Sequence, residues 1–329
     1  MRLPTVDELL ANVRVVALPM RTRFRGLDVR ETMLIASPLG RWGEFAAFPE
    51  YEDAESVPWL SCAIEQAWNQ LPSIEERPVF RDVVRTNATL PAVDAADVAA
   101  ILEGFGDFRT VKVKVAEPGQ VLEDDVARVR AARRFVGAAG RIRIDANGGW
   151  NVDEAEHAIR ALEQFDLEYV EQPCMSVDEL YEIRSRVHGL GIAIAADESV
   201  RKATDPVAVA RAGAADILVI KVAPLGGVRR ALNVIDEAGL PVVVSSALES
   251  SIGLGASFDL AMRIEHLDYD CGIATNVLFE RDVLPPVTDF GTFTATPGIV
   301  DESAAKELRV SPEREQWWRD RAARCLELL

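Results

Sequence analysis

The chain has 329 residues, of which 49% are hydrophobic, and it carries a formal net charge of −17. This length suits one large domain or two smaller ones, and the composition is that of a globular chain with a core. The acidic charge argues against nucleic acids and anionic membrane surfaces as partners, because both attract clustered lysine and arginine. A small anionic substrate remains compatible with it, since a site can be locally basic.

No window approaches the ~20 apolar residues of a membrane span, and the N-terminal stretch MRLPTVDELL lacks the apolar segment of a secretory signal. The cysteines are scattered without a CxxC pair, which is typical of reduced thiols. They are Cys62, Cys174, Cys271 and Cys325. We therefore expect a soluble, cytoplasmic protein. The sequence does not indicate an oligomeric state, and we slightly favour a monomer.

The first part of the chain, residues 1–78, predicts an antiparallel sheet followed by a helix. Strands are expected at 13–18, 30–36 and 41–45, with a turn at 37–40. The helix is expected from 54 to about 71, because Pro72 then stops it. The basic segment MRTRFRG (20–26) has two interpretations, a solvated hairpin loop or a basic lid over an anionic ligand.

From residue 79 to 284 the pattern is strand then helix, repeated about eight times. The expected strands are 83–88, 111–115, 141–145, 167–171, 192–197, 217–221, 241–246 and, more weakly, 271–275. The expected helices are 92–103, 122–136, one capped by Asp153 and running to 165, 177–187, 206–212, 228–238 and 252–263.

This alternation implies parallel strands joined by right-handed crossovers. An eight-stranded barrel is favoured over an open doubly wound sheet, because the number of repeats suits a barrel and no glycine-rich phosphate motif follows the first strand. The remaining tail, 285–329, contains Pro285–Pro286 and then a helix opened by Ser311 and Pro312. We expect the tail to fold back onto the N-terminal sheet.

Five consecutive strands of the predicted barrel end in a charged residue. In order they are Lys114, Asp145, Glu171, Asp197 and Lys221, and Ser246 ends the next strand. Function in barrels collects at the carboxyl ends of the strands. Two-residue alternation also turns Arg143, Tyr169 and Val219 inward. Each charged residue could by itself be a cap of the helix that follows its strand. Five independent caps, however, would not be expected to place these five residues at the ends of otherwise apolar strands.

Three carboxylates on one rim would repel one another without a cation. Oxygen ligands suit a hard ion, and Mg²⁺ fits because it keeps positions for water or substrate, with Mn²⁺ as a substitute. Asp145, Glu171 and Asp197 are therefore the predicted metal ligands. Glu198 follows Asp197, and alternation would aim it away, so we assign it to the surroundings of the ligands.

The two rim lysines, Lys114 and Lys221, flank the predicted metal site. At neutral pH almost every lysine side chain is already protonated and cannot accept a proton. A metal dication together with a neighbouring cation lowers the lysine pKa and so increases the neutral fraction that can act as a base. Lys112 lies two residues before Lys114 on the same face and is expected to be that neighbour. Lys114 would remove a proton α to a carboxylate, and Lys221 would face the enediolate from the other side.

These residues resemble the enolase superfamily in its muconate-lactonising subgroup, and the resemblance covers nearly the whole chain. It is carried by the KxK strand and by the segments RWGEF (41–45), RIDANGGW (143–150), EYVEQP (168–173) and ADES (196–199). RWGEF is similar to the GWGE segment of the family, with Arg41 in place of its first glycine. The resemblance implies a modified TIM barrel, (β/α)7β, with an α+β capping domain. The barrel would be 79–284, and the cap would combine 1–78 with the tail.

Within the superfamily, SSALESSIGL (245–254) is similar to the o-succinylbenzoate synthases of menaquinone synthesis. The resemblance implies a syn dehydration of 2-succinyl-6-hydroxy-2,4-cyclohexadiene-1-carboxylate, a dianion. Lys114 would take the α-proton and then protonate the leaving hydroxyl. One substrate carboxylate would bind the metal, and the other could meet backbone N–H groups near Ser250–Ser251. The expected substrate contacts are Lys112, Arg143, Asn147, Gly226, Ser245, Ser246, Ser251, Arg21 and Arg23.

The same two lysines would also serve an N-acylamino acid racemase or a dipeptide epimerase, because proton transfer at one carbon needs a group on each face. LDYD (267–270) resembles the Asp-x-Asp of dipeptide epimerases, but it precedes the strand expected at 271–275. Two further alternatives are a Schiff-base aldolase using Lys221 and a non-catalytic metal-binding barrel. The first does not explain three carboxylates, and the second does not explain two lysines.

Overall fold

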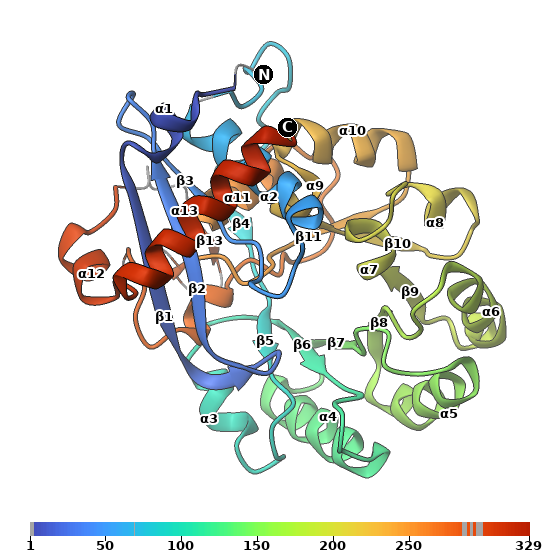
Figure 1. Ribbon diagram of the computed structural model, residues 1–329. Helices are drawn as coiled ribbons and strands as arrows, with labels where there is room; N and C mark the ends of the chain where they lie inside the picture. Colours follow the sequence, from blue (N-terminus) through green and yellow to red (C-terminus); the bar gives the residue numbers. More distant parts are fainter. Residues whose placement is uncertain (1–2, 69, 285–287, 290–291, 294–298) are drawn as a thin grey trace.

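The computed structural model describes residues 3–68, 70–284, 288–289, 292–293 and 299–329. An antiparallel sheet of β1 (Val13–Phe24), β2 (Leu27–Ala36) and β3 (Trp42–Phe45) follows the short helix α1 (Val6–Leu10). Helix α2 (Asp53–Ala67) comes next in the chain. In Figure 1 this blue unit lies to one side of the green and yellow barrel strands. The predicted order of sheet and helix is confirmed.

The hairpin joining β1 to β2 is longer than expected. Strand β1 continues to Phe24, with a register irregularity between Pro19 and Phe24, so only Arg25 and Gly26 form the turn. The interpretation of 20–26 as a loop is therefore wrong for most of the segment. Helix α2 also ends earlier than expected, at Ala67, well before Pro72.

The second sheet is parallel and curled, with the order β11-β10-β9-β8-β7-β6-β5. Its strands are β5 (Ala88–Leu90), β6 (Thr110–Lys114), β7 (Arg141–Asp145), β8 (Leu167–Glu171), β9 (Ala193–Ala196), β10 (Ile217–Lys221) and β11 (Val242–Ser245). Cys271 and Gly272 form parallel bridges with Thr86 and Ser245, at the two edges of this sheet. These bridges take the eighth place and close the (β/α)7β barrel that was predicted.

The eighth strand is shorter than the predicted 271–275, because the 3-10 helix η3 (Thr275–Leu278) begins almost at once. The preceding β4 (Val84–Arg85) is outside the barrel order, since it pairs with β13 (Thr292–Phe293), whose other partner is β12 (Thr288–Asp289). The predicted single strand 83–88 is thus divided between two sheets.

Helices connect the barrel strands. They are α3 (Val98–Glu103), α4 (Leu122–Val136), α5 (Val152–Leu162) with η1 (Glu163–Phe165), α6 (Val177–Val187) with η2 (His188–Leu190), α7 (Glu198–Arg201), α8 (Ala208–Arg211), α9 (Val222–Leu225), α10 (Val228–Ala238) and α11 (Ser251–Met262). The N-cap of α5 is Asn151, whose side chain accepts from the N–H of Glu154, so the prediction of Asp153 is wrong.

Inward-facing side chains fill the barrel as alternation predicted. Tyr169 and Val219 pack in a separate small apolar cluster with Ala195, Ile217 and Val243. The Arg143 guanidinium is fully buried and lies 4.8 Å from the Tyr169 ring centre. These packed side chains fill the barrel interior beneath the strand ends that carry the charged residues.

The tail packs on the N-terminal sheet, although Pro285–Pro286 lies outside the described residues. After α12 (Glu302–Glu307), Ser311 caps α13 (Pro312–Glu327), whose Trp318 ring meets Phe45 of β3 edge-on at 5.6 Å. Trp318 also donates from Nε1 to Glu31 Oε2 of β2 at 3.0 Å. In Figure 1 the red α13 crosses the blue hairpin, as expected for a tail that returns.

The cysteines, all four within the described part of the chain, are free and buried, as the sequence indicated. None of the helices that the structure describes is long and apolar enough to cross a membrane.

Candidate active site

The five predicted charged residues meet at one end of the barrel. Parallel register places Lys114 beside Asp145 and Asp145 beside Glu171, at the last position of their strands. Asp197 directly follows β9, and Lys221 ends β10. All three carboxylates are fully buried. The structure thus brings together the residues that sequence spacing selected.

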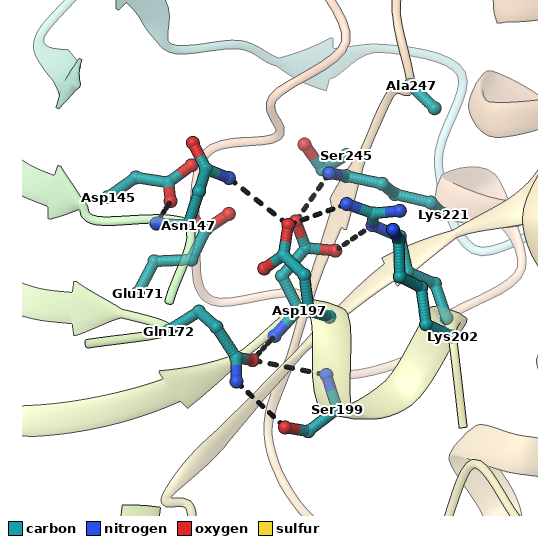
Figure 2. A network of polar contacts seen from close by, with 12 residues as sticks. Asp145, Asn147, Glu171, Gln172, Asp197, Ser199, Lys202, Lys221, Ser245 and Ala247 are labelled. Atoms are coloured by element: carbon teal, nitrogen blue, oxygen red, sulfur yellow. Dashed lines mark hydrogen bonds and ion pairs between the residues drawn. The ribbon is translucent and has the colours of Figure 1, made fainter. Parts of the chain in front are cut away.

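Each carboxylate faces a lysine ammonium group. Lys112 Nζ lies 2.8 Å from Glu171 Oε1 and 3.2 Å from Asp145 Oδ2. Lys114 Nζ lies 2.5 Å from the same Asp145 oxygen, so the two lysines share one carboxylate. On the other side, Lys221 Nζ lies 2.6 Å from Asp197 Oδ2, as Figure 2 shows. These ion pairs place lysine side chains on two sides of the acidic centre.

Burial opposes ionisation of all three carboxyls, and the neighbouring charges decide the outcome. For Asp145, Lys114 and Lys112 outweigh burial and hold its pKa well below the usual range. For Asp197, Lys221 and Arg201 do the same and lower its pKa to about 2. For Glu171, burial and repulsion by Asp145 outweigh Lys112 and raise its pKa to about 7. Of the three carboxylates, Glu171 is therefore the one that its neighbours compensate least with positive charge.

The donor set fits a hard cation. Glu171 Oε2 and Glu198 Oε2 are buried and have no hydrogen-bond partner within the described structure. As the side chains stand, the described residues contain no group of three or more His, Cys, Asp or Glu already arranged to hold a metal ion. Lysine ammonium groups neutralise the carboxylates instead. The chemistry of the orphaned oxygens nevertheless suits Mg²⁺ or a similar ion.

Glu198 lies differently from the sequence prediction. The chain leaves the strand at Ala196 and turns into α7, so two-residue alternation no longer applies and Glu198 lines the cavity. Its Oε1 accepts from Arg201 Nη2 at 2.6 Å and from Asn147 Nδ2 at 3.2 Å. Its assignment next to the metal ligands stays a prediction.

Two supporting residues were not selected from the sequence. Gln172 follows Glu171 and bridges to the Asp197 backbone, and Arg201 pairs with Asp197 from one helical turn later. The i,i+4 spacing of Asp197 and Arg201 was a signal that could have indicated this pair. The role of Gln172 depends on contacts between two strands, which spacing does not reveal.

A cavity of about 660 Å³ opens over the rim. Of the predicted substrate contacts, five line it: Arg23, Lys112, Asn147, Ser245 and Ser246. The hairpin tip between β1 and β2 also contributes, and the Phe24 ring centre lies 5.7 Å from Lys114 Nζ. Among the interpretations of 20–26, the structure therefore favours a cover over the site.

The other four predicted contacts do not line this cavity. Arg143 lies within the barrel, paired with Glu168. Gly226 ends α9, and its carbonyl accepts from Ser61 Oγ at 3.0 Å. Arg21 lines a second cavity of about 590 Å³.

Ser251, the fourth, lies at the start of α11, where the predicted carboxylate site is already occupied by protein groups. The Ser251 N–H donates to Asp282 Oδ2 at 2.9 Å. The Ser250 N–H donates to Glu44 Oε1 at 3.0 Å. The expectation that these amides receive a substrate carboxylate is therefore not met.

The chain matches known families along most of its length. The family described as "Enolase C-terminal domain-like" matches residues 93–299. The one described as "Enolase N-terminal domain-like" matches residues 15–67. Among curated relatives, the o-succinylbenzoate synthase of Mycobacterium tuberculosis (strain ATCC 25618 / H37Rv) is 50% identical, over 99% of this chain and 97% of its own length. That of Mycolicibacterium smegmatis is 49% identical, with 99% and 98% covered.

Solved structures show the same fold at lower identity. The N-succinyl Arg/Lys racemase from Bacillus cereus has a TM-score of 0.76 at 21% identity, covering 91% of this chain and 97% of its own. Muconate lactonizing enzyme from Pseudomonas putida has a TM-score of 0.72 at 20% identity, covering 91% and 98%. The L-Ala-D/L-Glu epimerase from Bacillus subtilis has a TM-score of 0.72 at 23% identity, covering 88% and 97%.

Proposed function

Because the chain belongs to the enolase superfamily, we propose that it is an o-succinylbenzoate synthase of menaquinone biosynthesis. It would convert 2-succinyl-6-hydroxy-2,4-cyclohexadiene-1-carboxylate to 2-succinylbenzoate by Mg²⁺-dependent syn dehydration. The observation that carries this choice is the 50% identity to o-succinylbenzoate synthases over nearly the full chain. The acidic centre flanked by two lysines supports the chemistry.

Asp145, Glu171 and Asp197 would hold the metal ion, with Glu198 beside them. Enzymes of this superfamily generally use a divalent metal ion. When bound, Mg²⁺ or Mn²⁺ would supply positive charge for the substrate carboxylate next to the reacting carbon. The orphaned Glu171 Oε2 supports this assignment, because a buried carboxylate oxygen without a donor is costly.

Lys114 would move the proton, and Lys221 would stabilise the charge that develops. Neutral Lys114 takes the proton α to the carboxylate, and the C–H electron pair passes into an enediolate. Lys221, on the other side of the centre, stabilises that negative charge and lies as a cation over the ring. Lys114 then returns its proton to the leaving hydroxyl, so the C–O bond breaks, water departs and the ring becomes aromatic.

The cavity suits a dianion. Its wall carries Arg23, Arg25, Lys112, Lys202 and both catalytic lysines. Since the amides at the start of α11 are occupied, we place the second carboxylate toward the cationic hairpin tip and Ser245 or Ser246. We also propose the domain division stated above, with cap 1–78 and 285–329 and barrel 79–284.

The direct test is turnover of the cyclohexadiene substrate with Mg²⁺, followed by loss of its absorbance. An N-acylamino acid racemase or dipeptide epimerase is the second candidate, since the two lysines lie on opposite sides of the acidic centre. Racemisation of N-succinyl amino acids or dipeptides in deuterated water, without aromatisation of the cyclohexadiene, would reject the synthase assignment.

Replacing the proposed base provides the matching prediction. Lys114→Ala should reduce dehydration and α-proton exchange by about 10²–10⁴-fold, because that is what proton transfer by a positioned group contributes. Mg²⁺ binding, measured by calorimetry, should persist because the three carboxylates remain. Undiminished exchange in Lys114→Ala would refute the role of this residue.

A further inference from the structure

A line of polar contacts leads from the hairpin tip into the barrel loop that carries Asp197. At the tip, Arg25 Nη2 donates to the phenol oxygen of Tyr51 at 2.8 Å. Tyr51 is buried, and Arg25 lines the same cavity as Arg201 and Lys202 of that loop. Lys202 Nζ, from the same loop, lies 5.2 Å from the Tyr51 ring centre. Tyr51 therefore joins the cap to the loop after β9.

Arg201 continues this line toward the reacting centre. Its side chain is only 5% exposed, and its guanidinium bonds two carboxylates at once. Nε lies 3.1 Å from Asp197 Oδ1, and Nη2 lies 2.6 Å from Glu198 Oε1. A planar two-pronged group fixes both partners, which a lysine in its place would not do.

Asn147 completes the line to Lys114. Its Nδ2 donates to Glu198 Oε1 at 3.2 Å, the oxygen that Arg201 also holds. Its Oδ1 accepts from Lys114 Nζ at 2.7 Å. The backbone of Asn147 is left-handed, with φ +49°, and its N–H donates to Asp145 Oδ1 at 3.0 Å. With its main chain constrained, the Asn147 side chain is held between Glu198 and Lys114.

We propose that Arg201 is a positioning residue that couples the hairpin tip to Lys114, through Glu198 and Asn147. With the tip docked on Tyr51, Lys114 Nζ is held in one orientation over the cavity. Coupling between two sites is reciprocal, so weakening the Arg201 contacts must also loosen the tip. The consequence for activity rests on the proposed function, whereas the consequence for the tip does not.

Two conservative variants test the coupling. Arg201→Lys keeps the positive charge but loses the planar group that contacts two carboxylates at once. Tyr51→Phe keeps the ring but loses the phenol oxygen. We expect kcat for dehydration to fall about tenfold in the first and about threefold in the second, with KM within about twofold. In the double variant, the loss should be smaller than the product of the single losses, because both act on one line of contacts.

Arg263→Lys, at the residue that follows α11, is the matched control. Arg263 is 7% exposed and pairs with Asp259 one turn earlier, at 2.8 Å, like Arg201 with Asp197. It should lose comparable thermal stability and keep the wild-type kcat. A kcat loss in Arg263→Lys as large as that in Arg201→Lys would overturn the proposal.

Amide hydrogen exchange of the peptide covering 20–27 reports on the hairpin tip. The exchange rate of this peptide would not change if Arg201 acted only on the loop that carries Asp197. Exchange there should be at least about threefold faster in Arg201→Lys and Tyr51→Phe than in wild type or Arg263→Lys. Unchanged exchange in Arg201→Lys would overturn the coupling, even if kcat falls. If wild type does not dehydrate the cyclohexadiene, the proposed function fails while the exchange experiment still decides the coupling.

Discussion

Gln172 illustrates how one buried amide can organise the rim. Its Oε1 accepts from the N–H groups of Asp197 at 2.9 Å and Ser199 at 3.2 Å. Its Nε2 donates to the Cys174 carbonyl and to Ser199 Oγ, both at 2.8 Å. Figure 2 shows this side chain bridging toward the loop that carries Asp197. Gln172 thereby fixes where β9 ends and where Asp197 points.

Gln172→Ala should lower the free energy of unfolding by about 3 kcal/mol, because it leaves two buried N–H groups and a carbonyl without partners. Urea unfolding measures this loss. The exposed Gln164 on η1 donates to a single carbonyl, so Gln164→Ala is the control and should change stability by less than about 0.5 kcal/mol. Equal effects of the two variants would contradict the role given to Gln172.

Strand β3 and helix α2 pack so closely at Gly43 that there is no room for a side chain there. A Cβ on Gly43 would lie 2.1 Å from the Ala63 carbonyl oxygen and 2.9 Å from its carbon. The next residue, Glu44, accepts from Ser250 Oγ at 2.5 Å and from the Gly253 N–H at 2.7 Å. Gly43 thus allows β3 to pack directly against α2, while Glu44 forms hydrogen bonds with the start of α11 in the barrel domain.

Gly43→Ala should destabilise the protein by about 3 kcal/mol, since the α2 backbone must move to relieve the overlap. A thermal melt would measure the change. A Cβ on Gly189 in η2 would meet no other atom within 4 Å, and the backbone there is not left-handed, so Gly189→Ala should leave the melting temperature nearly unchanged. A Gly43→Ala variant as stable as Gly189→Ala would show that this close packing is not required.

For the molecule as a whole, the seam between cap and barrel shapes one wall of the cavity. Arg30 of β2 donates from Nε to the Leu248 carbonyl at 3.1 Å. Leu248 lines the cavity and has a left-handed φ of +66°, a strained conformation for a bulky residue. The adjacent Glu249 is 1% exposed, and burial, reinforced by Glu44, raises its pKa to about 7.

Glu249 should make stability depend on pH. Its native pKa lies above the ordinary 4.5, so the native state binds the proton more tightly than the unfolded chain does. That stability is fully present below about pH 4.5 and is lost as the pH rises through about 7. Glu249→Gln should resemble wild type near pH 5 and exceed it near pH 8 by on the order of 3 kcal/mol.

Denaturant unfolding from about pH 5 to 8 checks this prediction through the difference between the two curves. Parallel pH dependences for wild type and Glu249→Gln would contradict the assignment to this carboxyl.

Much of the barrel and the five charged rim residues were predicted from the sequence because they depend on local periodicity. Strand ranges such as 141–145 and 217–221 agree with the structure, since β-branched runs with two-residue alternation need no distant partner to be recognised. Parallel strands then bring their ends to one rim whatever the details of the loops. Lys114, Asp145, Glu171, Asp197 and Lys221 follow from that rule.

Contacts between distant segments were decided only by the tertiary structure. The start of α11 appeared free to bind a carboxylate, but Glu44 and Asp282 reach it from segments far away in the chain. Glu198 turned toward the cavity because the strand ended one residue early, and Arg201 acquired its partners through the same turn. Periodicity reports which face a residue shares, whereas hydrogen-bond partners depend on where other elements pack.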